Sequence, residues 1–360
     1  MLLNGGGRRL RIFLLTVFGL LGVIFLWATS DTDSTQLKEA VASWPAAVAS
    51  HFAFDGGGSQ DGDPGGFPYV GGGRKYDEPV PPPPALPPTG DSHDAGASSM
   101  GATGAPYFVL IGDSTTCGQA KEGGGWGDAF LWQLARGAQG VNYGVNGALS
   151  TGYFHSPIWN AAMQEVRTNA LARPVYVTVQ FGHNDQNPNS NVTLDMYQDT
   201  LVGMAREVLE AGGTPFLVTP LARRDFDLDG TTVTDNLKDY RERTLQAHAV
   251  LQDDEASKKA RAINLNAASL AYIGAIGKTA AFRYNKWHPL VNDTTHLNEL
   301  GATVFARIVA DLMLGHPAAL VPSGERDPWA PGAGNDDGGL SGWIRPDPYM
   351  TGLVWHGDPI

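Results

Sequence analysis

The chain has 360 residues, 42% of them hydrophobic and 17% charged, which is enough to bury at least one substantial core. Acidic residues outnumber basic ones by 37 to 25, and the net charge of −12 argues against a nucleic-acid partner, because such a surface repels phosphate backbones. The single cysteine, Cys117, excludes an intramolecular disulfide and any cysteine-rich metal site.

The first thirty residues predict a membrane anchor. Arg8, Arg9 and Arg11 precede an uncharged run over residues 12–28, and the next charge is Asp31. A run of this length exceeds the core of most cleaved signal peptides and approaches the length that spans a bilayer. Basic residues before it and acidic ones after it favour a cytoplasmic N-terminus. We therefore expect residues 1–30 to form a cytoplasmic tip and a signal-anchor helix of a single-pass type II protein, with the rest in the Golgi lumen or outside the cell. The alternative is a cleaved signal and a secreted protein.

The next segment, residues 31–105, has the composition of a flexible stalk. Thirteen Gly and nine Pro lie within residues 54–105. Such a stretch buries too little apolar surface to offset the entropy lost on ordering, so we expect disorder there, with a stiffer patch at Pro81–Pro84.

From residue 106 onward, short apolar runs alternate with stretches of helical periodicity. The predicted strands are 107–111, 140–145, 175–181, 215–219 and 262–265. The predicted helices are 127–134, 158–171, 194–209, 236–251 and 298–314. This alternation predicts one α/β domain over residues 106–315, in which helices cover both faces of a parallel sheet.

The tail, residues 316–360, is again rich in Gly, Pro and Asp, but it also carries aromatic residues. These are Trp329, Trp343, Tyr349 and Trp355. Because disordered segments are poor in aromatics, we expect parts of the tail to pack on the domain.

A serine stands directly after the first predicted strand, in Gly112-Asp113-Ser114. At that place a hydroxyl lies at the ligand-binding edge of a parallel sheet, and a following helical turn directs backbone N–H groups toward it. Serine and aspartate are also common in turns and caps, so the tripeptide alone is weak evidence. The same three letters recur at Gly90-Asp91-Ser92 in the stalk, with no strand before them. Context, rather than the tripeptide, favours Ser114.

Three further blocks follow the pattern. Residues 142–147 after the second strand are rich in glycine, and Asn184 after the third carries two amide donors that can stabilise an oxyanion. Asp293 and His296, just before the last helix, have the spacing that lets a carboxylate orient an imidazole. Taken singly, each block is also compatible with a tight turn or a helix cap.

Together these blocks are more informative, because the ends of parallel strands meet at one edge of a sheet. They supply a nucleophile, oxyanion donors, a general base and a group that orients the base, with nothing left over for a metal. The sequence therefore predicts a hydrolase-type site.

The blocks resemble those of the SGNH (GDSL) hydrolase superfamily, and most of all those of rhamnogalacturonan acetylesterases. The resembling stretches are 108–115, 123–127, 142–153, 179–185 and 293–302. The resemblance implies a flavodoxin-like three-layer α/β/α sandwich with about five parallel strands and no cofactor. It does not extend to the anchor, the stalk or the tail.

The resemblance also assigns roles. It implies that Ser114 is the nucleophile, His296 the base and Asp293 its orienter, with an oxyanion hole made by the N–H groups of Ser114 and Gly147 and by the side chain of Asn184. The candidate substrate contacts are Trp126, Asp113, His183 and Trp287. Arg223 and Arg224 are candidates for an acidic sugar, although surface solvation is the commoner role.

The favoured function is a serine esterase that removes O-acetyl or other short acyl groups from carbohydrate through an acyl-serine. The alternatives are a sugar O-acetyltransferase, an esterase acting on lipid or other small esters, and a non-catalytic, membrane-displayed binding module. The expected partners are an acetylated carbohydrate or other small ester and, through the N-terminal helix, a membrane; the catalytic domain is expected to be monomeric. Of two glycosylation sequons, we expect use of Asn191 and not of Asn292, because a glycan on Asn292 would block the site.

Overall fold

The computed structural model describes residues 104–120, 123–288, 293–321 and 339–360. The predicted membrane anchor, the stalk up to residue 103 and Trp329 of the tail lie outside these residues. Within the described ranges, no helix is both long enough and apolar enough to cross a membrane.

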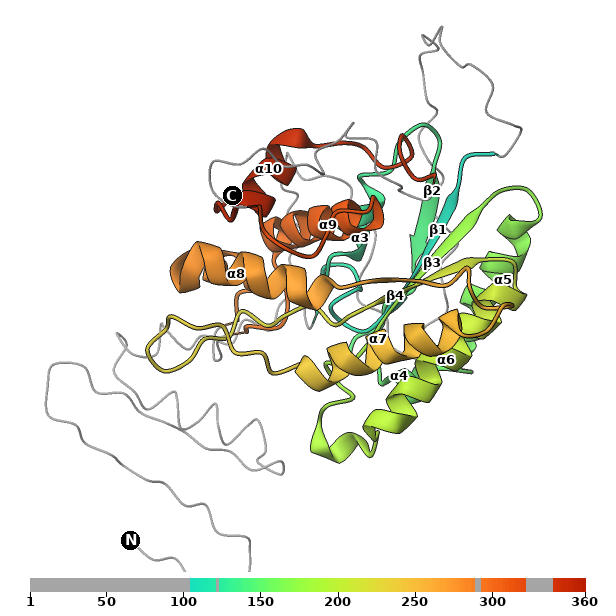
Figure 1. The fold of residues 1–360 in the computed structure, drawn as a ribbon, viewed down its shortest axis with the longest axis horizontal. Helices are drawn as coiled ribbons and strands as arrows, with labels where there is room; N and C mark the ends of the chain where they lie inside the picture. The colour runs from blue at the N-terminus through green and yellow to red at the C-terminus, as the bar shows by residue number, and fades with distance from the viewer. Residues whose placement is uncertain (1–103, 121–122, 289–292, 322–338) are drawn as a thin grey trace, which may run out of the picture. The chain divides into compact units, whose positions relative to one another are not determined.

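In the described part of the chain, one parallel sheet of five strands forms the centre, in the order β2-β1-β3-β4-β5 (Figure 1). The strands are β1 (Tyr107–Gly112), β2 (Gln139–Asn142), β3 (Val175–Gln180), β4 (Thr214–Val218) and β5 (Arg261–Ile263). β1 pairs with β2 on one side and with β3 on the other. The chain therefore reverses its direction of winding at β1, and crevices for ligands form at such a point beyond the carboxyl ends of the strands.

Helices cover both faces of this sheet, as Figure 1 shows. In chain order they are α3 (Gly127–Leu131), α4 (Ser150–Tyr153), α5 (Pro157–Ala170), α6 (Leu194–Glu210), α7 (Lys238–Gln252), α8 (Leu265–Ala281), α9 (Glu299–Met313) and α10 (Pro348–His356), with 3-10 turns η1 (Pro188–Ser190) and η2 (Phe282–Tyr284). The predicted three-layer sandwich with five parallel strands is confirmed. Three predicted elements were clearly too long, since the first helix ends at Leu131, the second strand at Asn142 and the last strand at Ile263.

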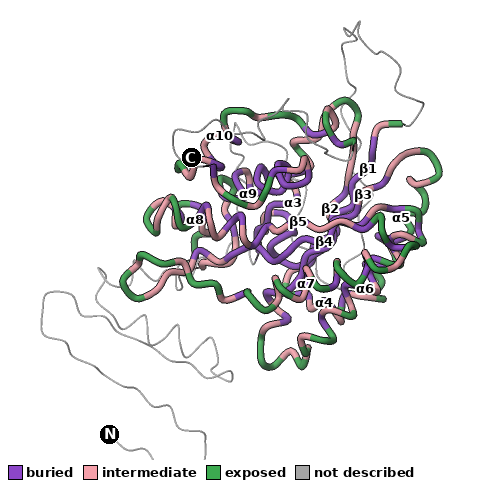
Figure 2. The backbone as a smooth tube through the Cα atoms, viewed as in Figure 1, coloured by how far each residue is buried: buried purple, intermediate pink, exposed green. Residues whose placement is uncertain are grey.

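The sheet separates two hydrophobic cores, and β1 contributes to both. Phe108 and Leu110 join the core under α3, α8, α9 and α10, whereas Val109 and Ile111 join the core under α5, α6 and α7. This follows from the two-residue period of a strand, whose successive side chains point to opposite faces. All six residues of β1 are buried, as expected of a central strand covered on both sides (Figure 2).

α8 is a helix that the sequence patterns did not reveal. The last apolar run predicts a strand to residue 265, but the strand ends before Asn264. The Oδ1 of Asn264 accepts a hydrogen bond from the N–H of Ala267, 3.1 Å away, and caps the start of the helix. Eight of its 17 residues are alanine or glycine, so its apolar face is poorly marked. Gly277, at φ 74°, also interrupts it near its end.

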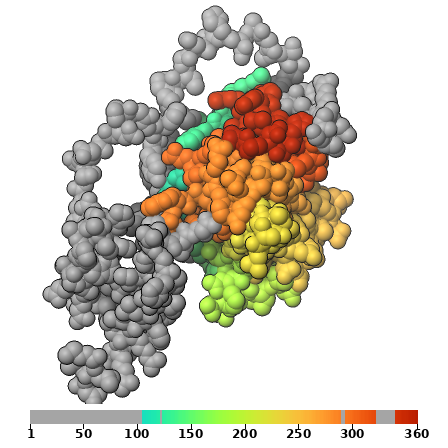
Figure 3. All heavy atoms as spheres, turned by 90° about the vertical axis from the view of Figure 1, so that its left-hand side faces the viewer, coloured from blue at the N-terminus to red at the C-terminus, as the bar shows by residue number. Residues whose placement is uncertain are grey.

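The described part of the tail belongs to the same core as the domain, so the predicted boundary at Gly315 does not mark the end of the core. Leu340, Ile344, Val354 and Trp355 are buried in the core that lies over α9. Figure 3 shows the tail, in red, lying directly against the orange surface of α8 and α9. The expected packing of tail aromatics on the domain is confirmed for Trp355.

A buried carboxylate joins α10 to α9. Asp311 accepts hydrogen bonds from Trp355 Nε1 at 2.9 Å and from Thr351 Oγ1 at 3.0 Å, and it pairs with Arg307 at 2.7 Å. The ring of His316 stacks on the indole of Trp355, with 3.8 Å between the ring centroids. The tail therefore fills the core and also supplies hydrogen-bond donors to a buried carboxylate. Burial of Asp311 costs little free energy only while these partners stay in place.

We expect Trp355→Ala to lower the free energy of unfolding by about 3–5 kcal/mol, because it leaves a large cavity and removes one donor to Asp311. Tyr349→Ala, at an exposed site on the same helix, should change it by no more than about 0.5 kcal/mol. Denaturant unfolding followed by circular dichroism measures both variants. If Trp355→Ala lowered the free energy of unfolding by no more than about 0.5 kcal/mol, as expected for Tyr349→Ala, the tail would not stabilise the domain.

Candidate active site

Ser114 lies in a tight turn just beyond β1. The N–H groups of Thr116 and Cys117 both donate to the carbonyl of Asp113, at 3.1 Å each, which makes the turn helical. A Cβ at Gly112 would lie 2.6 Å from the carbonyl oxygen of Gln180, so only glycine allows this close approach of β1 to β3. Ser114 is only 4% exposed, and the turn fixes its backbone.

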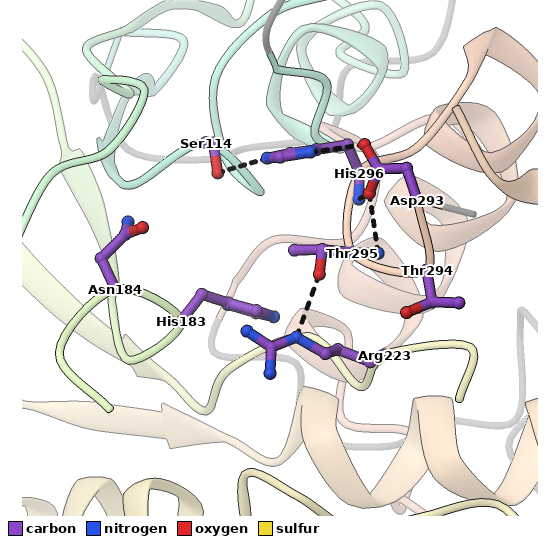
Figure 4. A pocket seen from close by; sticks show the side chains of 8 residues that line it. All are labelled: Ser114, His183, Asn184, Arg223, Asp293, Thr294, Thr295 and His296. Atoms are coloured by element: carbon purple, nitrogen blue, oxygen red, sulfur yellow. Dashed lines mark hydrogen bonds and ion pairs between the residues drawn. The ribbon is translucent and has the colours of Figure 1, made fainter. Parts of the chain in front are cut away.

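The structure brings Ser114, His296 and Asp293 into one chain of hydrogen bonds (Figure 4). His296 Nε2 is 2.8 Å from Ser114 Oγ, and His296 Nδ1 is 2.8 Å from Asp293 Oδ2. The serine and the histidine are 182 residues apart in sequence. With Nδ1–H donating to the carboxylate, Nε2 is left to accept the proton of the serine hydroxyl.

The loop that carries His296 is fixed through its backbone. The carbonyl of His296 accepts from the N–H of Lys286 at 2.9 Å and from Nη2 of Arg224 at 2.7 Å. The N–H of Leu297 donates to the carbonyl of Gly124 at 2.9 Å. Arg224 is fully buried and also donates to Asn285. Both roles considered for Arg224 in the sequence are therefore wrong, because its guanidinium holds the histidine loop.

Opposing effects act on the carboxyl group of Asp293. Partial burial raises its pKa. Hydrogen bonds from the ring and the N–H of His296 and from the N–H of Thr295 outweigh this effect and lower the pKa to about 2. Asp293 is therefore ionised at neutral pH. It can stabilise an imidazolium that forms on His296 without taking the proton itself.

Asn184 reaches the same edge of the sheet, because Gly112 of β1 pairs with Gln180 of β3. Its Nδ2 donates to the carbonyl of Ala148 at 3.0 Å, so the amide lies against the loop that contains Gly147. Gly147 has a φ of 73°, which favours glycine, and it is exposed. It does not line the cavity described below, and its part in an oxyanion hole stays a prediction.

Asp185 fixes the loop that carries Asn184. One of its oxygens accepts from the N–H and the hydroxyl of Ser150, at 2.9 and 2.5 Å, and the other accepts from the N–H of Gly182 at 3.1 Å. Burial raises the pKa of Asp185 to about 6 although these bonds oppose the rise. The start of α4 and the end of β3 are thereby joined beneath Asn184.

A cavity of about 410 Å³ lies above these groups. Its lining consists entirely of polar side chains: Ser114, His183, Asn184, Arg223, Asp293, Thr294, Thr295 and His296. This size suits a small molecule, but the lining differs from the mostly apolar walls of many such pockets. The site is therefore built for a ligand that itself carries polar groups.

One wall of the cavity contains His183, which forms a buried pair with Asp113 behind it. Nδ1 of His183 is 3.7 Å from Oδ2 of Asp113. Burial raises the pKa of Asp113, yet the contact with His183 and the hydrogen bonds from Thr115 bring it below its ordinary value. Burial lowers the pKa of His183. At neutral pH the pair therefore consists of a carboxylate and a neutral imidazole.

Arg223 lies beside His183 in the same wall (Figure 4). Its Nε donates to Thr295 Oγ1 at 3.0 Å, and with the amide of Gln186 turned so that its oxygen faces the guanidinium, that oxygen accepts at 2.5 and 2.7 Å. Burial lowers the pKa of Arg223, and the nearby carboxylates oppose the shift. Arg223 is thus a cavity residue, whereas surface solvation was the commoner expectation.

Comparison with known proteins identifies the family. A family model described as GDSL-like Lipase/Acylhydrolase matches residues 108–309, which contain all of the elements that position the site. The chain belongs to this family. The resemblance seen in the sequence is confirmed at that level, and the GDSL-like lipases and acylhydrolases are carboxylic ester hydrolases.

Individual relatives of this GDSL-family chain have modest similarity. Rhamnogalacturonan acetylesterase RhgT of Bacillus subtilis (strain 168) is 29% identical over 218 residues, which are 56% of this chain and 87% of that protein. Among solved structures, the Bacillus subtilis protein YxiM is 25% identical with a TM-score of 0.49, over 59% of this chain and 56% of that chain. A catalytic mutant of Axe2, an acetylxylan esterase from Geobacillus stearothermophilus, is 19% identical with a TM-score of 0.41, over 58% of this chain and 93% of that chain.

Two predicted substrate contacts of this GDSL-family site are wrong, and a third lies off the cavity. Trp126 is fully buried, and its Nε1 donates to Gln180 Oε1 at 2.8 Å, so the indole belongs to the core. Asp113 is buried behind His183 and does not line the cavity. Trp287 is 80% exposed and is not part of the lining, so a contact with substrate there stays a prediction. His183 does line it.

Other side chains in this region have structural roles. Gln180 Oε1 accepts from Trp126 and also from Thr116 Oγ1, at 2.7 Å, which ties the serine turn to β3. Cys117 is buried, and burial raises the pKa of its thiol, so it is a packed, unreactive group. Across the described ranges, no group of three or more His, Cys, Asp or Glu side chains is arranged to hold a metal ion.

We expect Asp293→Asn to flatten the pH dependence of stability in acid. Because the pKa of Asp293 in the folded chain, about 2, is below its ordinary value of 3.8, the carboxylate stabilises the fold above about pH 4 and this stabilisation is lost as the pH falls toward 2. The shift corresponds to at most about 2 kcal/mol, and solvent screening at this half-buried site reduces that figure. Urea unfolding at pH 2, 3, 4 and 7 compares wild type with Asp293→Asn. A constant difference between the two at all four values would contradict the assignment.

Proposed function

We propose that this chain is a serine esterase that removes O-acetyl groups from carbohydrate through an acyl-serine intermediate. The observation that carries the proposal is the unbroken hydrogen-bond chain from Ser114 Oγ through His296 to Asp293, which opens into a polar cavity. Nucleophile, base and orienter within hydrogen-bond reach of one another are the geometric signature of nucleophilic catalysis.

In the proposed reaction, Ser114 Oγ attacks the ester carbonyl while its proton passes to His296 Nε2. The negative charge on the carbonyl oxygen is stabilised by the N–H of Ser114, the amide of Asn184 and, as predicted, the N–H of Gly147. His296 returns the proton to the departing sugar oxygen, which leaves an acetyl group on Ser114. A water molecule then gives its proton to His296 and attacks the acetyl carbon, and acetate leaves as Ser114 regains its proton.

Two observations support carbohydrate, rather than lipid, as the substrate class. The residues that line the cavity carry imidazole, amide, hydroxyl, carboxylate and guanidinium groups, and none of them is a large aliphatic residue. In addition, the curated relative matched over 87% of its length is named for the removal of acetyl groups from rhamnogalacturonan. Both observations favour a substrate that carries hydroxyl groups.

The test is acetate release from acetylated pectin, acetylated xylan and an aryl acetate. We expect Ser114→Ala to lower kcat by roughly 10⁴-fold or more, because the covalent route is lost. Ser92→Ala is the matched control, since it alters the same Gly-Asp-Ser tripeptide in the stalk, and it should have wild-type activity. Undiminished acetate release by Ser114→Ala would refute the mechanism. Acetyl transfer to an added sugar, with no free acetate in water alone, would favour the transferase.

We also propose that residues 1–30 anchor the chain, with its domain in the lumen of the secretory pathway or outside the cell. The support is the basic flank and the uncharged run of the sequence. The structure offers a reporter of this location, because Asn191 of the sequon Asn191-Val192-Thr193 is exposed at the end of η1.

We therefore expect the full chain, expressed in a eukaryotic cell, to carry one endoglycosidase-sensitive glycan that Asn191→Asp removes. Aspartate keeps the size of the side chain and tolerates the left-handed backbone of this residue, at φ 57°. Asn292→Asp should not change the glycan, because a glycan beside Asp293 would obstruct the cavity. A glycan mapped to Asn292 on active enzyme, or an unglycosylated full chain, would contradict the proposal.

A further inference from the structure

His183 is a buried polar side chain that faces the cavity without a hydrogen-bond partner. Its side chain is only 2% exposed, and among the described residues neither ring nitrogen makes a hydrogen bond. The same ring lines the cavity together with Ser114. An unpaired buried nitrogen is costly, and native structures rarely leave one without a partner. A group that enters the cavity is the natural partner.

Asp113 determines which nitrogen of the ring carries the proton. Its Oδ1 accepts from the N–H and the hydroxyl of Thr115, at 2.9 and 2.8 Å, so the carboxylate cannot turn away. Its Oδ2, which has no hydrogen bond within the described residues, faces Nδ1 of His183 at 3.7 Å. A carboxylate at this distance favours the proton on Nδ1. Nε2 is then left with a lone pair and acts as an acceptor.

The neighbouring charges keep the ring neutral. Burial lowers the pKa of His183 and the positive charge of Arg223 lowers it further, while Asp113 opposes them. An acceptor nitrogen repels a carboxylate or a carbonyl oxygen and attracts an O–H group. A hydroxyl bound there can also accept from Arg223, which lies next to His183 in the cavity wall (Figure 4).

We propose that Nε2 of His183 accepts a hydrogen bond from a free hydroxyl of the substrate alcohol, close to the acetylated oxygen. Figure 4 shows Ser114 and His296 on one side of the cavity and Asn184, His183 and Arg223 on the facing side. In this proposal the alcohol part of a bound ester lies against His183 and Arg223. The inference rests on the proposed esterase function and deepens it: the site selects esters of polyhydroxylated alcohols. Asp113 is then a positioning residue for this selection.

The first experiment removes the hydroxyl from the substrate. Wild-type protein is assayed with methyl 3-O-acetyl-β-D-xylopyranoside and with its 2-deoxy and 4-deoxy analogues. Each analogue lacks one of the two hydroxyl groups next to the ester. We expect kcat/KM to fall roughly 10- to 100-fold for at least one deoxy analogue, because Nε2 is left unpaired. Equal kcat/KM for all three substrates would overturn the proposal.

The second experiment removes the acceptor. In His183→Leu the preference for the parent over the deoxy analogue should shrink to under about threefold, and in His183→Gln, whose amide oxygen can accept, part of it should remain. His356→Leu is the matched control at the end of α10, outside the cavity, and should keep the wild-type preference. The preference is a ratio within one preparation, so a smaller folded fraction does not alter it.

Retention of the full preference by His183→Leu would also overturn the proposal. Neither negative result affects the proposed esterase function, whose test is the loss of acetate release in Ser114→Ala. Conversely, if Ser114→Ala keeps its activity, the esterase mechanism fails whatever the deoxy analogues show.

Discussion

The site depends on the register in which β1 and β3 pair. Gly112 lies opposite Gln180, so the two central strands end at the same level and release Ser114 and Asn184 at one edge of the sheet. The pairing is as close as it is because residue 112 has no side chain: a Cβ there would meet both Thr116 and the carbonyl of Gln180. A slip of one residue would turn the side chains of β1 to the opposite face, so Phe108 and Leu110 would have to fit the space of Val109 and Ile111 in the other core. The register of β1 thus sets the position of Ser114, the proposed nucleophile.

The proposed base, His296, does not follow a strand of this sheet but lies on a loop before α9. The buried guanidinium of Arg224 and the N–H of Lys286 hold the His296 carbonyl, and Asp293 binds both the ring and the backbone of the same residue. A loop fixed at three points has little freedom left to lose when the serine reacts. Such preorganisation is what catalysis by positioned groups requires.

Sequence reasoning found what local pattern and spacing encode. The strands, most of the helices, and Ser114, Asp293 and His296 as neighbours followed from the positions of apolar runs and of polar residues after them. The sequence did not predict α8, because its many alanine and glycine residues mark no clear apolar face. It did not predict α10, because the surrounding tail is rich in Gly and Pro, which are typical of loops. The buried roles of Trp126 and Arg224 depend on contacts with residues far away in the chain, such as Gln180 and Asn285, and a single sequence does not contain them.

Asp113 shows how one residue can serve both walls of the cavity. Its backbone carbonyl closes the turn that holds Ser114, one carboxylate oxygen binds Thr115 in the same turn, and the other faces His183. Asp113 therefore contacts both the turn that carries Ser114 and the facing wall that contains His183. An ionised buried carboxylate is costly without compensating partners, so the contacts of Asp113 with Thr115 and His183 are needed to stabilise its charge. The chemistry of the ester and the recognition of its alcohol are, on this view, coupled through the residue that precedes the serine.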